Sequence, residues 1–219
     1  MFNTSTSAPY VTDDQQGFQD LVIAEAFKRL GLKARVEKYD ASARALINAN
    51  DGVDDGVAMR IKGLEANFPN LVRVQERLIV NDFVAYSRGL DLRSETWESL
   101  KPYMVGYING WVIFERNLPS NQPKATVRDP QQMFAMLNKQ RIDVALYERW
   151  QGLYNAHSSG LIVKVHEPPL ASVDMYMYVH KKHAKLAQPL AKVLRAMKAD
   201  GTYQAIYDKS LTVLNDKSK

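Results

Sequence analysis

The sequence predicts an α/β protein made of two doubly wound lobes that are joined by two hinge strands. Three observations lead to this prediction. Helical and strand-like apolar patterns alternate from residue 17 to residue 68, a second alternating series starts at residue 96, and two long extended segments, 78–87 and 172–180, flank that second series. Alternating strands and helices favour a largely parallel sheet. Two long extended segments are what two crossings between lobes require.

The first series begins with an amphipathic helix over residues 17–31, where apolar side chains recur at helical spacing up to a terminal glycine. Residues 32–38 alternate apolar and charged side chains, which is typical of a strand. The next elements are expected as a helix from Asp40, a suitable N-cap, to Asn50, a buried strand over 55–59 and a helical segment over 61–68.

The second series has the same order. Asp129 followed by Pro130 predicts the start of a helix, because proline suits the first helical position. The other elements are expected as a helix over 96–103, strands over 104–108, 125–128 and 142–147, a helix over 110–116 and a tryptophan-containing helix after residue 147. The pair Pro168–Pro169 is expected to break the pattern before the second long extended segment.

The end of the chain contains a defined joint, in which Gly201 separates a helical pattern over 186–200 from another over 202–211. Tyr203 and Ile206 share one face of the last helix, so an upstream surface is expected to receive them. We therefore expect the final helices to return to the first lobe. The predicted lobes are residues 1–85 with 176–219, and residues 86–175.

Composition and charge limit the function classes. Of the 219 residues 46% are hydrophobic and 24% are charged, as in globular proteins, and no apolar run approaches the ~20 residues that span a bilayer. The net charge of +5 arises partly from lysines near the C-terminus, which are expected on solvated surface. A basic face with interleaved aromatic residues is absent, so no nucleic-acid partner is expected. A mild positive charge favours an anionic small molecule.

Catalytic and metal-binding patterns are also absent. The chain has no cysteine and no GxSxG, HExxH or Walker sequence. His180 and His183 are three residues apart, but they lie in a lysine-rich segment that begins a helix. We therefore expect no catalytic residue, no metal site and no cofactor.

Several segments carry a resemblance to a known family. They are "APY" (8–10), "GFQDLVIAEAFKRLG" (17–31), "DGVAMR" (55–60), "LKPYMVGYINGW" (100–111), "RIDVALYE" (141–148) and "LRAMKADGTYQAIYDKSL" (194–211). Together they resemble the bacterial extracellular solute-binding proteins of family 3, the receptor components of polar amino acid ABC transporters. The resemblance covers nearly the whole chain. It implies the type II periplasmic binding protein fold, with a ligand in the cleft between two lobes and closure by hinge motion.

Candidate ligand-binding residues follow from the rule that open α/β sheets bind ligands beyond the carboxyl ends of their strands. A first strand is expected before Tyr10. The rule selects the residues that lie at the ends of the expected strands or just after them: Tyr10, Arg60, Tyr107, Asn109, Gly110, Trp111, Tyr147 and Glu148.

Arg60 is the strongest candidate, because a guanidinium group binds a carboxylate through two parallel hydrogen bonds. The structural alternative is an ion pair with Glu65 or Asp55. The resembling family usually has its binding arginine after a Ser/Thr-rich stretch a few positions further on, whereas this chain has "AMRIKGLE" (58–65).

The candidates of the second lobe have alternatives of their own. Asn109 and Gly110 open a helix, where free amide groups suit an anion. Trp111 stands where the family usually has a small hydroxyl residue, and it is expected either to stack on a ligand or to fill the lobe core. Glu148 stands where the family often has an aspartate that binds the ligand ammonium, and its alternative is a carboxylate in the first turn of a helix. The tyrosines suit a cleft or a core rim.

The expected function is capture of a small polar, carboxylate-bearing, amino-acid-like ligand for ABC transport or sensing. Its partners would be a membrane permease or a sensor protein, and the binding protein is expected to be a monomer in the periplasm. The first residues show neither a basic segment nor a long apolar segment, so an export signal is expected either to be absent or to have been removed, and the sequence does not decide between the two. The alternative is an enzyme that uses the same cleft, such as a cyclohexadienyl-dehydratase-like lyase.

Overall fold

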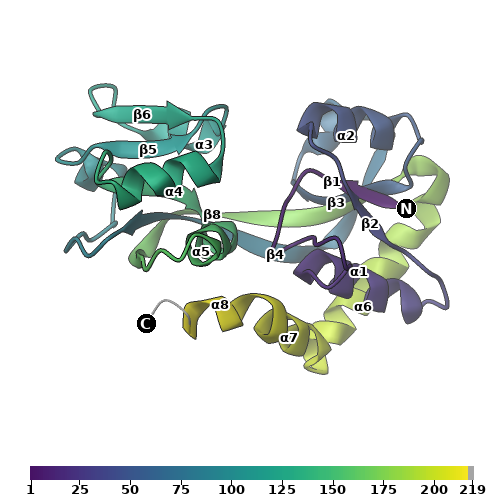
Figure 1. Cartoon of the computed structure of the whole chain (residues 1–219). Coiled ribbons are helices and arrows are strands. Elements are labelled where there is room, and N and C mark those ends of the chain that lie inside the picture. The colour runs from purple at the N-terminus through teal and green to yellow at the C-terminus, as the bar shows by residue number, and fades with distance from the viewer. Residues whose placement is uncertain (217–219) are drawn as a thin grey trace. The chain divides into compact units, whose positions relative to one another are not determined.

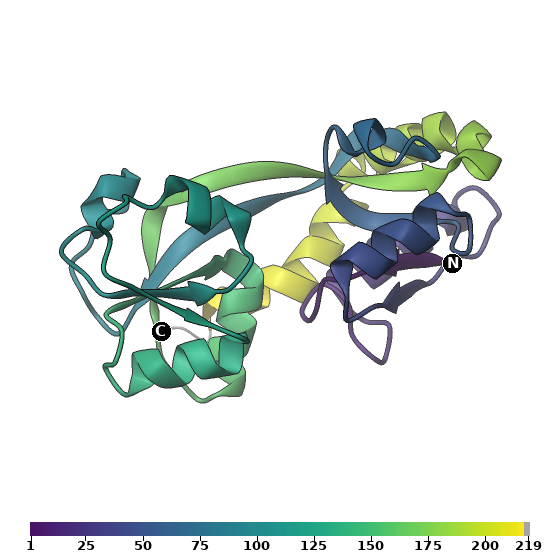
Figure 2. The same cartoon turned by 90° about the horizontal axis from the view of Figure 1, so that it is seen from above.

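The computed structural model describes residues 1–216 as an α/β protein with two compact units (Figures 1 and 2). Unit 1 consists of Met1–Val80 with Val173–Val213, and unit 2 consists of Asn81–Ser172 with the chain from Leu214. Two long strands, β4 (Leu71–Ser87) and β8 (Lys164–His180), each begin in one unit and end in the other.

The limits of the units differ from the expected lobes in two respects. The boundaries inside the long strands lie at 80/81 and 172/173, where 85/86 and 175/176 were expected. Leu214, which was expected in lobe 1, is grouped with unit 2. Residues 217–219 of the expected first lobe lie outside the described residues.

Unit 1 is built on a sheet with the strand order β2-β1-β3-β8. Strand β1 (Phe2–Thr4) pairs in parallel with β2 (Val36–Lys38) and with β3 (Gly56–Ile61), and β3 pairs antiparallel with β8. Its helices are α1 (Phe18–Lys28), α2 (Ser42–Asn50), α6 (Ala187–Ala199) and α7 (Thr202–Tyr207), with 3₁₀ segments at Leu64–Ala66 and Lys181–Leu186 and a π-helical turn at Asp208–Thr212. The short α8 (Val213–Asp216) follows.

Helix α1 begins where the sequence pattern places it. The Asp20 carboxylate accepts a hydrogen bond from the amide of Gly17, the N-cap residue, at 3.0 Å, and another from the Thr12 amide in the preceding loop, also at 3.0 Å. A side chain at position 17 would meet the Tyr10 carbonyl oxygen at 2.4 Å, so this close approach requires glycine.

The terminal joint is formed by Gly201, whose φ of +82° lies in the left-handed region. Helix α6 ends before it, and α7 then lies against α1. The Tyr203 ring meets the buried Phe18 ring edge-on, with ring centres 5.6 Å apart, and its hydroxyl donates to the Leu78 carbonyl at 2.8 Å. The upstream surface that receives α7 is therefore made by α1 and by the first part of β4.

Unit 2 has the strand order β4-β7-β5-β6. Strand β5 (Val105–Ile108) pairs in parallel with β6 (Lys124–Val127) and β7 (Val144–Glu148), and β4 pairs antiparallel with β7. The helices are α3 (Val112–Asn117), α4 (Pro130–Asn138) and α5 (Arg149–Ser158), with a 3₁₀ segment at Trp97–Leu100. The Asp129 carboxylate caps α4 by accepting from the Gln132 amide at 2.7 Å, as the Asp-Pro signal predicts.

Three sequence expectations are wrong in detail. The helical segments expected over 61–68 and 96–103 are only short 3₁₀ turns, and in the first of them Gly63 adopts a φ of +88° that interrupts a helix. The pair Pro168–Pro169 does not break the chain but lies inside β8. Proline fits extended backbone and loses only one donor, so a strand with an unpaired amide tolerates it.

Among residues 1–216, no helix has the length and apolar character needed to cross a membrane.

Candidate functional site

Arg60 lies near the carboxyl end of β3, as the strand pattern predicts, and its side chain is half-buried. One terminal nitrogen, Nη1, donates to the Met59 carbonyl at 3.0 Å; the other, Nη2, donates to the hydroxyls of Ser5 and Ser42 at 3.2 and 3.4 Å. The Nε atom is buried and has no hydrogen-bond partner. Every partner of this guanidinium is therefore neutral.

The expected ion-pair alternatives for Arg60 do not form. Glu65 pairs with Arg73 at 3.8 Å, and Asp55 pairs with Lys182 at 3.0 Å and His183 at 2.7 Å. In the described part of the chain no carboxylate lies within ion-pair distance of Arg60. Burial lowers the pKa of Arg60 to about 10, so the group stays charged at neutral pH. A half-buried cation without an anion is stabilised when a carboxylate binds to it.

The surroundings of Arg60 contain further donors. Ser42 is the first residue of α2, and the N-cap position, Ala41, offers no side chain that could cap the helix. The first turn of α2 contains no acidic residue. An open cavity of about 410 Å³ beside this helix start is lined by Lys38 and Arg44 among others. Asp40 lines the same cavity, so its two cations outnumber one carboxylate. Together with the positive end of α2, this excess of positive charge adds to the attraction for an anion.

Tyr10, the other candidate of unit 1, is fully buried. Its ring meets the Phe18 ring edge-on at 6.2 Å between centres, and its carbonyl accepts from the Gln19 amide at 2.8 Å. The structure thus places Tyr10 in the core of unit 1, apart from the half-buried Arg60.

In unit 2 the candidates Tyr107, Trp111 and Tyr147 belong to one aromatic cluster. The Trp111 ring stacks on Phe114 at 5.8 Å and lies 4.6 Å from the Tyr147 ring, centre to centre. Trp111 is half-buried, while Tyr107 and Tyr147 are buried at 3% and 5% exposure. Burial raises the pKa of both phenols, which therefore remain neutral at pH 7. Trp111 fills the edge of the unit 2 core and still presents part of its ring.

Asn109 and Gly110 are exposed in the turn between β5 and α3. The Gly110 amide, which was expected to be free for an anion, donates to the Glu115 carboxylate at 2.9 Å, and the Asn109 amide donates to the Val127 carbonyl at 2.9 Å. The expectation of free amides here is wrong, because Glu115 folds back over the start of its own short helix.

Glu148 ends β7 and is fully buried. Its carboxylate oxygen Oε2 accepts from the Gln151 amide at 2.9 Å, so it caps α5. This is the alternative that the sequence offered for Glu148. A buried cap of this kind stabilises the helix by about 1 kcal/mol.

Sequence reasoning missed Ser5 and Ser42, the hydroxyl partners of Arg60. The hydroxyl-rich segment Thr4–Ser7 and the serine that opens α2 were the available signals, but no spacing rule brings them to the same guanidinium. Among residues 1–216, no three potential metal ligands gather.

A serine-histidine pair in unit 2 also escaped the sequence analysis. Ser87 Oγ lies 2.8 Å from His166 Nε2, and His166 Nδ1 lies 2.8 Å from the Leu92 carbonyl. A carbonyl only accepts, so Nδ1 carries the proton and the serine hydroxyl donates to Nε2. The side chains are 0% and 1% exposed, which leaves no access for a substrate. The pair holds the loop after β4 in place.

Comparison with known proteins finds one protein of similar sequence and several solved structures of similar fold. No family model matches the chain. An uncharacterized protein of Shewanella oneidensis is 26% identical over 193 residues, which are 84% of this chain and 72% of that protein. The glutamate-bound GluR0 ligand-binding core of Nostoc punctiforme has a TM-score of 0.74 and 17% identity over 95% of this chain and 97% of its own. The chain has the fold of the type II periplasmic binding proteins.

Two further solved structures share this fold. The second substrate-binding domain of a putative amino acid ABC transporter from Streptococcus pneumoniae has a TM-score of 0.72 and 21% identity, with coverage of 96% and 100%. A histidine kinase sensor domain similar to periplasmic binding proteins has a TM-score of 0.71 and 13% identity, with coverage of 96% of both chains. All three solved structures are binding or sensor domains. The predicted fold class is confirmed.

Proposed function

We propose that the protein is a solute-binding protein that captures a small polar ligand with a carboxylate group, for ABC transport or for sensing. Arg60 carries this proposal, because it is a half-buried guanidinium whose partners are all neutral. The fold supports it, since the Nostoc domain of the same fold binds L-glutamate. Closure of the two units on the ligand, which the family resemblance implies, is part of the proposal.

The remaining candidates complete the proposal at a finer level. We propose ligand contacts for Asn109, Gly110 and the partly exposed Trp111 ring, with the buried Tyr107 and Tyr147 rings behind them. The fully buried Tyr10 and Glu148 are proposed only as residues that support these elements from within each unit. The proposed partner is a membrane permease or a sensor protein. The proposed state is a periplasmic monomer without a cofactor.

Titration calorimetry with a library of amino acids, mono- and dicarboxylates and neutral amides tests the proposal. Arg60→Ala should weaken the best carboxylate ligand roughly 10- to 100-fold, because a hydrogen bond to a charged group contributes about 1.5–3 kcal/mol. The matched control is Arg128→Ala, which removes an exposed arginine of unit 2 and should leave affinity unchanged. Unchanged affinity in Arg60→Ala would remove Arg60 from the site.

The proposal includes that the protein is not an enzyme. Glu148, the candidate acid or base of the lyase alternative, is buried and caps α5, and the Ser87-His166 pair is closed to substrates. A ligand incubated with the protein should therefore be recovered unchanged when it is analysed by mass spectrometry. Conversion of the ligand would favour the enzyme alternative.

A further inference from the structure

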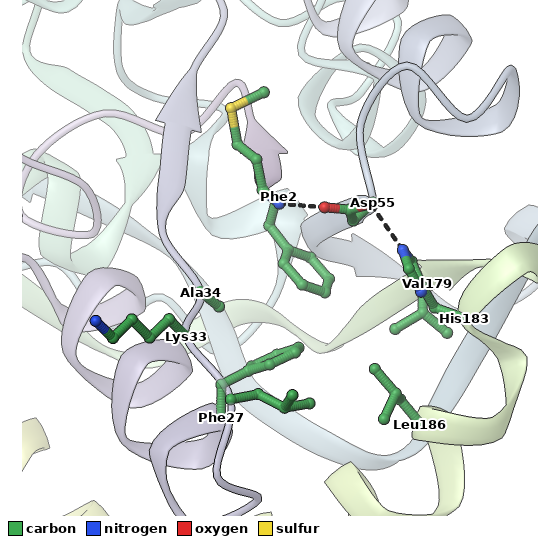
Figure 3. A pocket seen from close by; sticks show the side chains of 10 residues that line it. Phe2, Phe27, Lys33, Ala34, Asp55, Val179, His183 and Leu186 are labelled. Atoms are coloured by element: carbon green, nitrogen blue, oxygen red, sulfur yellow. Dashed lines mark hydrogen bonds and ion pairs between the residues drawn. The ribbon is translucent and has the colours of Figure 1, made fainter.

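Unit 1 contains a second cavity, of about 240 Å³, which lies away from Arg60 (Figure 3). It is formed at the amino ends of β1 and β3, the carboxyl end of β8 and the segment after α1. Arg60 is four residues further along β3 than its first residue, Gly56, which corresponds to roughly 13 Å of strand. The cavity and the guanidinium are therefore at opposite ends of this strand.

The walls of the cavity are mainly apolar. They comprise Phe2, Phe27, Leu32, Ala34, Val179 and Leu186. The rings of Phe2 and Phe27 meet edge-on at 5.3 Å between centres and form one side (Figure 3), while Leu186 faces them from the 3₁₀ segment. An apolar cavity of about 150 Å³ is known to take up benzene in another protein. This cavity has room for a phenyl group with a short chain.

The polar edge of the cavity has an excess of positive charge. Among the described residues, Asp55 is the one acidic group that lines it, and it is already paired with Lys182 at 3.0 Å. It is also paired with His183 at 2.7 Å and with the Met1 amino group, as the dashed lines of Figure 3 mark. Lys33 lines the cavity, and Lys185 is next to the lining Leu186.

Three lysines of the segments that border the cavity, Lys33 after α1 and Lys181 and Lys185 in the 3₁₀ segment, are exposed and form no ion pair with any carboxylate of residues 1–216. The neighbouring His180 responds to this charge: burial and then the charges of Lys182 and Lys181 lower its pKa. An anion at the open edge of the cavity would lie in the field of cations whose charge no protein carboxylate offsets.

We propose that this cavity is a second ligand site, which takes a small amphipathic carboxylate with an aryl or short alkyl group. The apolar group enters between Phe2, Phe27 and Leu186, and the carboxylate remains at the open edge of the cavity. Removal of the apolar group from water drives binding. The positive charge of the exposed lysines on the bordering segments, among them Lys33 and Lys185, favours the anion through its long-range field and not through a direct contact. This site is independent of the carboxylate site proposed at Arg60.

The test uses 3-phenylpropionate as the probe, with neutral 3-phenylpropanol and cationic 3-phenylpropylamine as analogues of the same shape. Binding to the full chain is measured by calorimetry and by amide chemical shifts in nuclear magnetic resonance. We expect 3-phenylpropionate to bind at least fivefold more tightly than either analogue. The shifts should concentrate at residues 32–34 and 183–186.

Two variants locate the site. Leu186→Trp fills the cavity and should weaken 3-phenylpropionate at least tenfold, whereas Arg60→Ala should leave this probe unaffected. The double variant Lys33→Glu, Lys185→Glu should abolish the preference for the anion, and Lys139→Glu, an exposed lysine of unit 2, is the matched control. If Leu186→Trp does not fold, the amide shifts of the unaltered protein decide the location.

Several outcomes would overturn the proposal. They are no binding of 3-phenylpropionate, equal binding of 3-phenylpropanol, amide shifts centred on residues 5, 42 and 60, and undiminished binding by a folded Leu186→Trp protein. Failure of the Arg60 site would appear separately, as a library ligand whose affinity Arg60→Ala does not change.

Discussion

The two units each contain a half-buried arginine, and the two arginines differ in their partners. In unit 2 the Arg149 side chain, 14% exposed, pairs with Asp82 at 3.3 Å and with Glu167 at 2.7 Å. Burial lowers the pKa of Arg149, but these carboxylates outweigh it and the net pKa is raised. In unit 1 Arg60 has only a carbonyl and two hydroxyls, and burial lowers its pKa. The charge of a structural arginine such as Arg149 is balanced by carboxylates of the same protein, whereas the charge of Arg60 is not.

The largest expected effect comes from exchanging these arginines for methionine. Arg149→Met leaves Asp82 and Glu167 without their cation and should reduce the free energy of unfolding by about 3 kcal/mol. Arg60→Met removes a charge that no carboxylate offsets, so it should leave that free energy within about 1 kcal/mol of the original value. Urea denaturation followed by circular dichroism measures both. Equal destabilisation by the two substitutions would remove the distinction between these arginines.

A carboxylate ligand should supply the anionic partner that Arg60 lacks and should therefore stabilise the folded protein. At a concentration 100 times its dissociation constant, a carboxylate selected by the library titration should stabilise the unaltered protein by about 2.7 kcal/mol. The same concentration should stabilise Arg60→Met much less, while an Arg128→Met control should respond as the unaltered protein does. Thermal unfolding with and without ligand provides the measurement. Equal stabilisation of Arg60→Met would show that the ligand binds elsewhere.

One buried group in each unit, Asp20 in unit 1 and His166 in unit 2, should make stability depend on pH with opposite signs. Burial raises the pKa of Asp20 in unit 1 from 3.8 to about 6, so the folded state binds a proton that the unfolded state releases above pH 3.8. The contribution of Asp20 to stability is therefore present at low pH and is lost as pH rises towards 6. The pKa difference corresponds to about 3 kcal/mol at most, and we expect about 2. Asp20→Asn should remove this dependence.

His166 in unit 2 behaves in the opposite way. Burial lowers its pKa, so the unfolded state gains a proton below about pH 6.5 before the folded state does. Its contribution to stability is present at neutral pH and is lost as pH falls below that value. His166→Gln should reduce this acid sensitivity. The free energy of unfolding is measured by urea denaturation at a series of pH values between 4 and 7.5. Comparison of Asp20→Asn and His166→Gln with the unaltered protein separates the contributions of the two residues. An unchanged pH profile in both variants would contradict the assignment.

The smallest expected effect concerns the joint between α6 and α7. Gly201 has a φ of +82°, and no atom lies within 4 Å of an added Cβ, so Gly201→Ala meets backbone strain but no steric clash. We expect a loss of about 1 kcal/mol. Gly31→Ala is the matched control in unit 1, because it has a φ of +70° and equally open space. A much larger loss at Gly201 would mean that the docking of Tyr203 on Phe18 depends on this turn.

Much of the secondary structure was predictable because it depends on local chemistry. Asp129-Pro130 marks the start of α4, and the apolar spacing after Gly17 marks α1. The expected helix over 61–68 failed where glycine at a left-handed φ broke the spacing, and the Pro168–Pro169 break failed because an extended strand accepts proline. The sequence offered two roles for Glu148, a ligand contact and a helix cap. Its burial and its hydrogen bond from the Gln151 amide show that it caps α5.

The sequence by itself determined the α/β alternation, the two long extended segments and the position of Arg60 near the end of a strand, because periodicity and turn chemistry act over a few residues. Only the tertiary structure decided that Ser5 and Ser42 reach Arg60 without a carboxylate, and that Glu115 occupies the Gly110 amide. It also decided that apolar residues of β1, α1, the segment after α1, β8 and the following 3₁₀ segment enclose a cavity. These contacts join side chains that are distant in sequence. Their formation depends on how the strands and helices pack, and no local pattern encodes that.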